Sequence, residues 1–375
     1  MVVLNNKRTA IVVGAGIVGL AIARALAVRN YHVTVFERTP KAIGASVRNF
    51  GMIWPIGQPD GELYNRAILS KQIWKELCGA ANIWYEEKGS LHLAYAEDEL
   101  QVLEELRDIY QGRKYQLLNK GQVNQLSAVV QQNGLLGGLY SKEEMVVNPK
   151  QAIDQVAAYL HEQYHVQFIR KAVVTNISYP VVSCGSQQYQ ADEIYVCSGA
   201  DFETLYPELF EKLSITKCKL QMLRFEAQAD GLRIGPSLCG GLSLLHYQSF
   251  KKSPSLDILR QRLVNEFPEH IKWGIHVMVS QHASGELTVG DSHEYGEVHD
   301  PFDKQHINTL ILEYLKSFTR FENDNILETW NGIYSKMTNG DAHVIVSPEP
   351  GVTVINGMGG AGMTLSFGLC EELKR

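Results

Sequence analysis

Three glycines and one acid near the start of the chain have the types and spacing that could do chemistry. An apolar stretch, Ala10-Ile11-Val12-Val13, runs into Gly14-Ala15-Gly16-Ile17-Val18-Gly19, and Glu37 ends the next apolar stretch. The first glycine permits a tight turn, the second lets backbone N–H groups approach a pyrophosphate, and the third lets a helix pack close to a strand. Glu37 can then accept hydrogen bonds from a ribose. The pattern predicts a dinucleotide-binding βαβ unit.

A second glycine-rich element lies near the other end of the chain. The strand pattern Val352-Thr353-Val354-Ile355 precedes Asn356-Gly357-Met358-Gly359-Gly360-Ala361-Gly362, and a helix is predicted from Met363 to the end. Such a helix N-terminus offers N–H donors to an anion or an electron-rich carbonyl, although a close-packed turn would look the same. Two separated glycine elements favour FAD over NAD. A flavin must be held at its adenosine end and again where negative charge develops on the reduced ring.

Composition narrows the class of protein. The chain has 375 residues, of which 45% are hydrophobic and 20% charged, so it can bury a large core and is expected to form two domains. A net charge of -6 argues against nucleic acid as a partner. No stretch is apolar enough to span a bilayer, so a cytoplasmic location is expected. The six cysteines are scattered without metal-ligand spacing, so reduced thiols and no metal site are expected.

The glycine elements must be positioned by alternating strands and helices. Hydrophobic spacing predicts helices at 62–78, 97–110, 149–163, 256–266 and 302–318. Strand patterns lie at 84–96, 166–169, 172–177 and 193–197, and residues 217–291 are richer in strand-like alternation. One strand stops at Ser198-Gly199-Ala200, where a glycine suggests backbone close to a ligand. The loop Arg48-Asn49-Phe50-Gly51-Met52-Ile53-Trp54-Pro55 is too apolar to be a solvent loop.

With these parts the sequence resembles the D-amino acid oxidase family of flavoenzymes, which includes glycine oxidase and sarcosine oxidase. The resemblance covers most of the chain. It rests on the opening unit with Glu37-Arg38, the loop 44–51, Val173, residues 191–199, and Trp330-Asn331-Gly332 leading through Asp341 to Gly362.

The resemblance implies an α/β fold with two domains. A Rossmann-like, non-contiguous FAD-binding domain would comprise 1–80, 145–215 and 325–375. A mainly antiparallel β substrate-binding domain with flanking helices would comprise 81–144 and 216–324. By resemblance, Val173 would contact adenine. The residues expected to bind FAD are Gly14, Ala15, Gly16, Ile17, Val18, Gly19, Glu37, Arg38, Arg48, Asn49, Gly51, Met52, Val173, Ser198, Gly199, Gly332, Met358, Gly359, Gly360, Ala361, Gly362 and Met363.

The resemblance also implies a reaction. Members of the family oxidise a C–N bond by passing hydride from the carbon beside the amine to flavin N5, giving an imine that hydrolyses. The substrate would be a small primary or N-methylated amine, and O₂ or another acceptor would take the electrons. The protein mainly orients a neutral amine, so no residue is assigned as a general acid or base.

Two departures from the family pattern bear on the substrate. Amino-acid-oxidising members carry an arginine for the substrate carboxylate where this chain has Tyr334 or Ser335, and glycine oxidase has another near Gly360. The flavin-bonding cysteine of sarcosine oxidase is also missing near Tyr334 to Lys336, so FAD is expected to be non-covalent.

The apolar loop from Arg48 to Pro55, together with Leu244-Leu245-His246-Tyr247, resembles a branch of the family associated with aminophosphonate breakdown. A phosphonate dianion needs more positive charge than a carboxylate. The expected substrate residues are Arg48, Trp54, His246, Tyr247, His276, Tyr334 and Lys336. Each has a plainer reading, because a histidine in a strand is often structural and Lys336 could be a solvated loop charge.

Alternatives stay open at this point. The substrate that the branch resemblance favours is an aminoalkylphosphonate such as 2-aminoethylphosphonate or its N-methyl form. The first alternative is a glycine, sarcosine or D-amino acid oxidase. Gly290-Asp291 leaves room for an FAD monooxygenase, although no proline-bearing helix pattern follows. A flavin-binding module without turnover is the third alternative. Substrate-dependent bleaching of the flavin separates these classes.

Overall fold

The opening βαβ unit forms as the sequence predicts. This computed structural model describes residues 7–374. β1 (Thr9–Val13) leads through the glycine turn to α1 (Ile17–Ala27), and β2 (His32–Glu37) returns parallel to β1. Most of α1 is buried because alanine and aliphatic residues cover nearly all of its surface. The small side chains let neighbouring helices approach it on several sides.

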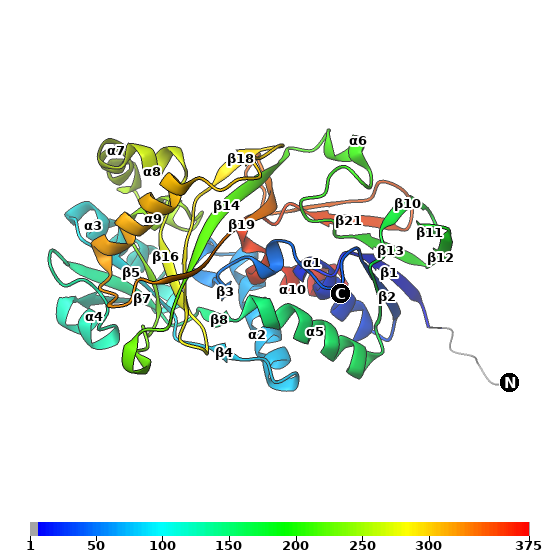
Figure 1. Cartoon of the computed structure of the whole chain (residues 1–375), viewed down its shortest axis with the longest axis horizontal. Coiled ribbons are helices and arrows are strands. Elements are labelled where there is room, and N and C mark those ends of the chain that lie inside the picture. Colours follow the sequence, from blue (N-terminus) through cyan, green and yellow to red (C-terminus); the bar gives the residue numbers. More distant parts are fainter. Residues whose placement is uncertain (1–6, 375) are drawn as a thin grey trace.

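A six-stranded sheet extends this unit. Its order is β20-β21-β13-β1-β2-β9, and all neighbours are parallel except β20 and β21. Helices α1, α2, α5 and α10 contribute to the hydrophobic core beside this sheet (Figure 1). The further elements are β9 (Gln167–Arg170), β13 (Glu193–Val196), β20 (Val344–Val346), β21 (Val352–Asn356), α2 (Glu62–Ala80), α5 (Pro149–Tyr164) and α10 (Gly362–Leu373). The last helix was predicted to reach the chain end, and Arg375 lies outside the described residues.

A nine-stranded sheet forms the other half of the molecule. Its strands are antiparallel except for the pair β15–β5. Figure 1 shows α3, α4, α7, α8 and α9 around this sheet, on the side away from the six-stranded sheet. Its elements are β5 (Ser90–Ala94), β6 (Gln116–Asn119), β7 (Gly137–Ser141), β14 (Ile215–Phe225), β15 (Ser237–Cys239), β16 (Met278–Gln281), β17 (Leu287–Gly290), β18 (Glu294–Gly296), β19 (Ile326–Met337), α3 (Glu97–Ile109), α4 (Lys120–Leu126), α7 (Leu256–Glu266), α8 (Pro268–Lys272) and α9 (Gln305–Phe318).

Two small antiparallel sheets complete the fold. One consists of β3 (Met52–Ile53), β8 (Met145–Val147) and β4 (Tyr85–Glu86), and it lies where the chain passes between the two large sheets. The other consists of β10 (Val174–Ser178), β11 (Val181–Cys184) and β12 (Gln187–Gln190). The short helix α6 (Pro207–Phe210) precedes β14. The α/β fold class is confirmed, whereas the domain boundaries stay a prediction.

Within 217–291 the structure confirms several strands and the helix at 256–266, but the expectation of a strand around His246 is wrong. A short 3₁₀ helix, Gly241–Leu245, follows β15, so His246 is not a strand residue. The Ser243 hydroxyl and its backbone N–H both donate to the Gly240 carbonyl, at 2.6 and 3.0 Å. Such a local side-chain bond competes with strand pairing and favours a turn. Among residues 7–374, no helix combines the length and apolar character that a membrane crossing requires.

Glu144 links the small β3–β8–β4 sheet to the nine-stranded sheet. Its carboxylate accepts hydrogen bonds from the Ile56 N–H and the Ser90 hydroxyl, both at 3.0 Å. The side chain is buried, and burial raises the pKa of Glu144 from 4.5 to about 6. The folded state therefore binds this proton more tightly than the unfolded chain does.

We predict a pH-dependent stability difference between the wild type and Glu144→Gln. The raised pKa contributes stability that is complete below pH 4.5 and lost as pH rises through about 6. Relative to the glutamine variant, the wild type should lose about 2 kcal/mol between pH 4 and pH 8. Urea unfolding at both pH values measures this. Glu104→Gln, at an exposed site, is the control, and an equal pH response in all three proteins would contradict the prediction.

Candidate active site

A cavity of about 530 Å³ opens at the carboxyl ends of the parallel strands. Val13, Phe36 and Cys197 line it, and they mark the ends of β1, β2 and β13. β2 and β13 flank β1 on opposite sides, so the strand order reverses at this point. In open α/β sheets, ligands bind in the crevice at such a switch point.

The first and third glycines of the opening motif are required by steric contact. Gly14 has φ +102°, and a Cβ there would lie 2.4 Å from the Cys197 carbonyl oxygen. A Cβ on Gly19 would lie 1.8 Å from the Gly14 carbonyl oxygen, so α1 begins almost in contact with the turn. Gly16 has φ −72°, which any residue adopts. A Cβ there would lie 3.0 Å from the Ser46 hydroxyl oxygen, so a side chain would crowd the start of α1.

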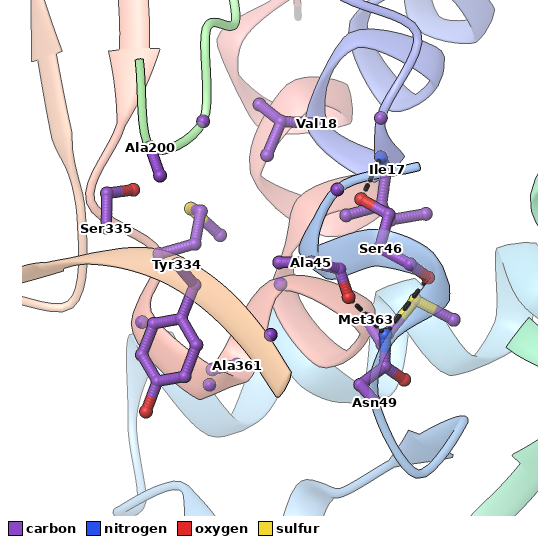
Figure 2. A pocket seen from close by; sticks show the side chains of 18 of the residues that line it. Ile17, Val18, Ala45, Ser46, Asn49, Ala200, Tyr334, Ser335, Ala361 and Met363 are labelled. Atoms are coloured by element: carbon purple, nitrogen blue, oxygen red, sulfur yellow. Dashed lines mark hydrogen bonds between the residues drawn. The ribbon is translucent and has the colours of Figure 1, made fainter. Parts of the chain in front are cut away.

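Sequence reasoning missed Ser46, which packs against this helix start. Its hydroxyl oxygen accepts a hydrogen bond from the Ile17 N–H at 2.9 Å (Figure 2). The Asn49 amide donates to the carbonyls of Ala45 and Ser46, at 2.9 and 3.0 Å, which fixes the loop. A serine three residues before an asparagine within a glycine-bearing loop is the signal that could have found this turn.

Glu37 is held at the cavity by the backbone. Its carboxylate accepts hydrogen bonds from the Ala15 N–H at 3.0 Å and from the N–H and hydroxyl of Thr39, at 3.0 and 2.7 Å. A carboxylate offers about four acceptor positions, so one remains for a ligand hydroxyl. Arg38 forms an ion pair with Asp201, and both side chains line the same part of the cavity.

The two glycine elements meet in space although most of the chain separates them. A Cβ on Gly362 would contact the Ile17 side chain at 3.4 Å. Figure 2 shows Ile17 and Met363 on the neighbouring starts of α1 and α10. The N-termini of two helices therefore border one cavity, and each leaves N–H groups without intrahelical partners.

The structure brings nearly all of the predicted cofactor residues to this cavity. Ala15 and Gly51 are the exceptions. Ala15 is buried behind the turn, and Gly51, at φ +74°, packs against the Val147 carbonyl. Val173 lines the cavity with 43% of its surface exposed. The lining residues are Gly14, Gly16, Ile17, Val18, Gly19, Glu37, Arg38, Arg48, Asn49, Met52, Val173, Ser198, Gly199, Gly332, Met358, Gly359, Gly360, Ala361, Gly362 and Met363.

The predicted substrate residues line the same cavity. Trp54 and Tyr247 lie with their ring centroids 6.3 Å apart and form an aromatic wall. Tyr334 on β19 is buried, and a Cβ on Gly360 would meet its hydroxyl at 3.9 Å. Arg48 lines the cavity, and its Nη1 donates to the Asn331 carbonyl at 3.0 Å. The Asn331 carbonyl therefore takes up one N–H donor of the guanidinium that the sequence analysis assigned to a ligand.

Lys336 is a strand residue and not a solvated loop charge. It lies on β19, pairs with Met358 through an isolated β-bridge, and lines the cavity. Its ammonium donates to the Tyr295 hydroxyl at 2.9 Å. Burial lowers the pKa of Lys336 from its ordinary value. An anion in the cavity would offset that desolvation.

Four polar groups gather where the cavity meets the nine-stranded sheet. One ring nitrogen from each of His246, His276 and His293 lies within 4.8 Å of the others. Asp291 Oδ1 lies 3.2 Å from His276 Nε2, although the two are not aligned as a hydrogen bond. Sequence reasoning found His246 and His276 but missed His293 and Asp291. Residues 290–293 pair with residues 273–278, and only this register, which the sequence does not show, brings Asp291 and His293 beside His276.

Burial controls the charge of this cluster. It lowers the pKa of His246 and His276 well below 6.5, with repulsion between the rings adding to the effect, and lowers the pKa of His293 to about 4. It raises the pKa of the Asp291 carboxyl well above 3.8. Neutral imidazoles are therefore favoured in the ligand-free protein, and they can either accept a proton or bind a cation.

Comparison with known proteins identifies the family. The family described as "FAD dependent oxidoreductase" (DAO) matches residues 9–375. The chain belongs to this family. It is therefore an FAD-dependent oxidoreductase, and the glycine elements, Glu37 and the continuous cavity fit that cofactor.

Solved structures share the fold. Glycine oxidase from Geobacillus kaustophilus is 19% identical, with a TM-score of 0.75, over 98% of this chain and 94% of that one. FAD-bound L-alpha-glycerophosphate oxidase from Mycoplasma pneumoniae is 20% identical, with a TM-score of 0.74, over 98% and 94%.

A curated relative is the tRNA 5-methylaminomethyl-2-thiouridine biosynthesis bifunctional protein MnmC from Saccharophagus degradans. It is 24% identical over 62% of this chain and 34% of its own length. The matched part spans about a third of the length of the curated relatives.

We predict that Gly14→Ala loses both stability and bound FAD. The alanine Cβ would lie 2.4 Å from the Cys197 carbonyl in a backbone conformation that L side chains avoid. A cost of about 3 kcal/mol or more is expected, with a lower ratio of flavin to protein absorbance. Gly79→Ala on α2 is the control, because its Cβ meets nothing within 4 Å. Full flavin content in Gly14→Ala would refute this role of the turn.

Proposed function

We propose that this chain oxidises a small primary or N-methylated amine that carries an anionic group. Bound FAD would supply the hydride acceptor that converts the C–N bond to C=N, after which water releases the carbonyl product and the amine. O₂ or another acceptor would then take up the electrons. The observation that carries the proposal is one continuous cavity joining the glycine elements to a pole formed by Lys336 and three histidines.

The chain's own residues would hold FAD in three places. Glu37 has an acceptor position left for a ribose hydroxyl, and Val173 lines the cavity where adenine is expected. The start of α1 would bind the pyrophosphate, and the start of α10 would face the ring carbonyls. Cys197 is the one cysteine among the described residues that lines the cavity, and it lies beside Gly14, away from β19. That placement supports non-covalent binding, because no cysteine of the described lining stands where sarcosine oxidase carries its flavin-bonding cysteine.

The substrate pole would bind the anion without an arginine from β19. Tyr334 and Ser335 stand where an amino-acid-oxidising relative would carry that arginine. Arg38 is paired with Asp201, and Arg48 donates to a backbone carbonyl. Lys336, the remaining lysine or arginine among the described lining residues, would therefore supply the fixed charge. The aromatic wall of Trp54 and Tyr247 would shape the space for a small carbon chain.

We infer further that the anion is a phosphonate, as in 2-aminoethylphosphonate or its N-methyl form. A dianion with three oxygens would engage the ammonium of Lys336 and several imidazoles together, whereas a carboxylate offers two oxygens. A structural neighbour is named for glycerophosphate, another phosphorus oxyanion, which supports a substrate of this shape. Glycine oxidase, a neighbour of similar structural similarity, supports the amino acid alternative. Substrate trials must separate these two.

The decisive trial is anaerobic mixing of the flavin-loaded protein with glycine, sarcosine, D-alanine, 2-aminoethylphosphonate and its N-methyl form. Flavin absorbance near about 450 nm reports reduction. We expect bleaching by the phosphonates at concentrations where the amino acids leave the flavin oxidised. Bleaching by the amino acids alone would show that the anionic group of the substrate is a carboxylate and not a phosphonate. If no amine bleaches the flavin, the proposed function is overturned.

We predict that Lys336→Met weakens the binding of the substrate with little change in flavin content. Loss of a charge-assisted hydrogen bond costs about 1.5–3 kcal/mol, which is about a 10- to 150-fold rise in the concentration for half-maximal flavin reduction. Lys336→Arg should retain most of the affinity. Lys252→Met, at an exposed lysine, is the control. Unchanged affinity in Lys336→Met would remove this residue from the anion site.

A further inference from the structure

The three-histidine cluster has features that anion binding alone does not require. One nitrogen of each ring lies within 4.8 Å of the other two. The His246 and His276 ring centroids are 3.8 Å apart, and those of His276 and His293 are 5.0 Å apart and nearly parallel. Imidazoles gathered so closely cannot all be protonated, because like charges at this distance repel strongly in a buried site. The arrangement suits a ligand that is itself positive.

The buried atoms of the cluster lack partners within the protein. His276 is 4% exposed, and neither of its ring nitrogens has a hydrogen bond. Asp291 is 5% exposed, and its Oδ1 is also without one. Unpaired buried polar atoms are costly, so a native structure that keeps several together indicates a missing ligand. The cluster lines the cavity, so that ligand has a route of entry.

The neighbouring groups orient the rings as they do at metal sites. His293 Nδ1 lies 2.9 Å from the Gly274 carbonyl oxygen, so Nδ1 carries the proton and the Nε2 lone pair stays free. His293 Nε2 is 3.9 Å from Asp291 Oδ2, and His276 Nε2 is 3.2 Å from Asp291 Oδ1. A backbone carbonyl on the far nitrogen of a ligating histidine is usual at metal centres, and Asp291 lies on the Nε2 side, where His293 is free to bind.

We propose that His246, His276 and His293 bind a divalent first-row transition metal of the zinc type, with Asp291 beside them. Imidazole nitrogen suits zinc and its neighbours, whereas magnesium and calcium prefer oxygen. Zinc–nitrogen bonds of about 2.1 Å put tetrahedral ligand atoms roughly 3.4 Å apart, so the three nitrogens, now within 4.8 Å of one another, would draw together on binding the metal.

Three protein ligands leave one position open toward the cavity. A substrate oxyanion would coordinate the metal there, in place of the arginines that this chain lacks. This last step rests on the proposed function, whereas metal binding itself does not. The expectation of no metal came from cysteine spacing, and these ligands come from three separate segments, which linear spacing does not report.

The test is zinc binding to chelator-treated, FAD-loaded protein, measured by calorimetry and by elemental analysis after dialysis. We expect about one zinc per wild-type chain and at least about tenfold weaker binding in His246→Gln and in His276→Gln. His282→Gln is the matched control, because His282 is buried in the same sheet and bonds Thr288 at 2.8 Å. Flavin content and circular dichroism establish that each variant is folded. If His276→Gln does not fold, His246→Gln, at a half-buried site, still tests the metal site.

Two outcomes overturn the metal site. One is zinc well below one equivalent, and the other is equal affinity in every variant. Tight binding of methylphosphonate by metal-free protein that zinc does not strengthen would overturn the coordination of the oxyanion by the metal and make the histidines a direct anion site. Both measurements omit the amine. Zinc binding without flavin bleaching would therefore refute the proposed function alone, and bleaching without zinc binding would refute the metal alone.

Discussion

The close approach of α1 to the end of β1 is the constraint on which the rest of the structure depends. At Gly14 and Gly19 the backbone leaves no space for a side chain, because atoms of Cys197 and of the turn itself already lie there. The contact sets the start of α1 over the carboxyl ends of β1 and β13. It also places Ile17 against α10, so the second glycine element is positioned by the first. A helix start fixed by such contacts can offer N–H groups to a ligand with little reorganisation.

The long pair β14–β19 lies within the nine-stranded sheet, and these two strands connect that sheet along the chain to the cofactor half. The two strands pair from Ile215 with Met337 to Phe225 with Ile326, so their register is fixed over many residues. β19 therefore brings residues 332–336 to the cavity wall. Gly332, Tyr334 and Lys336 share one face of the strand. Because Lys336 also bridges to Met358, the substrate pole is tied directly to the turn before α10.

The electrostatic character of the cavity differs along its length. At one end, helix N-termini and Glu37 form a polar site built mostly from backbone. At the other, charge depends on desolvated side chains, because burial lowers the pKa of Lys336 and of the three histidines. Groups of this kind bind strongly only to a ligand that compensates the loss of water. Under the proposed function, the neutral imidazoles and the lack of an arginine at Tyr334 or Ser335 would belong to one site, different from a simple carboxylate pocket.

The sequence alone determined the opening βαβ unit, the second glycine element and most of the helices, because these depend on local spacing and on glycine's freedom from a side chain. Most of the residues that it assigned to the cofactor and the substrate, through family resemblance, line the cavity. It did not reveal Ser46, Asp291 or His293, and it put His246 in a strand. Those placements depend on contacts between segments far apart in the chain. Strand register and side-chain burial, which no local pattern encodes, decided which polar groups meet and which of them are left without partners.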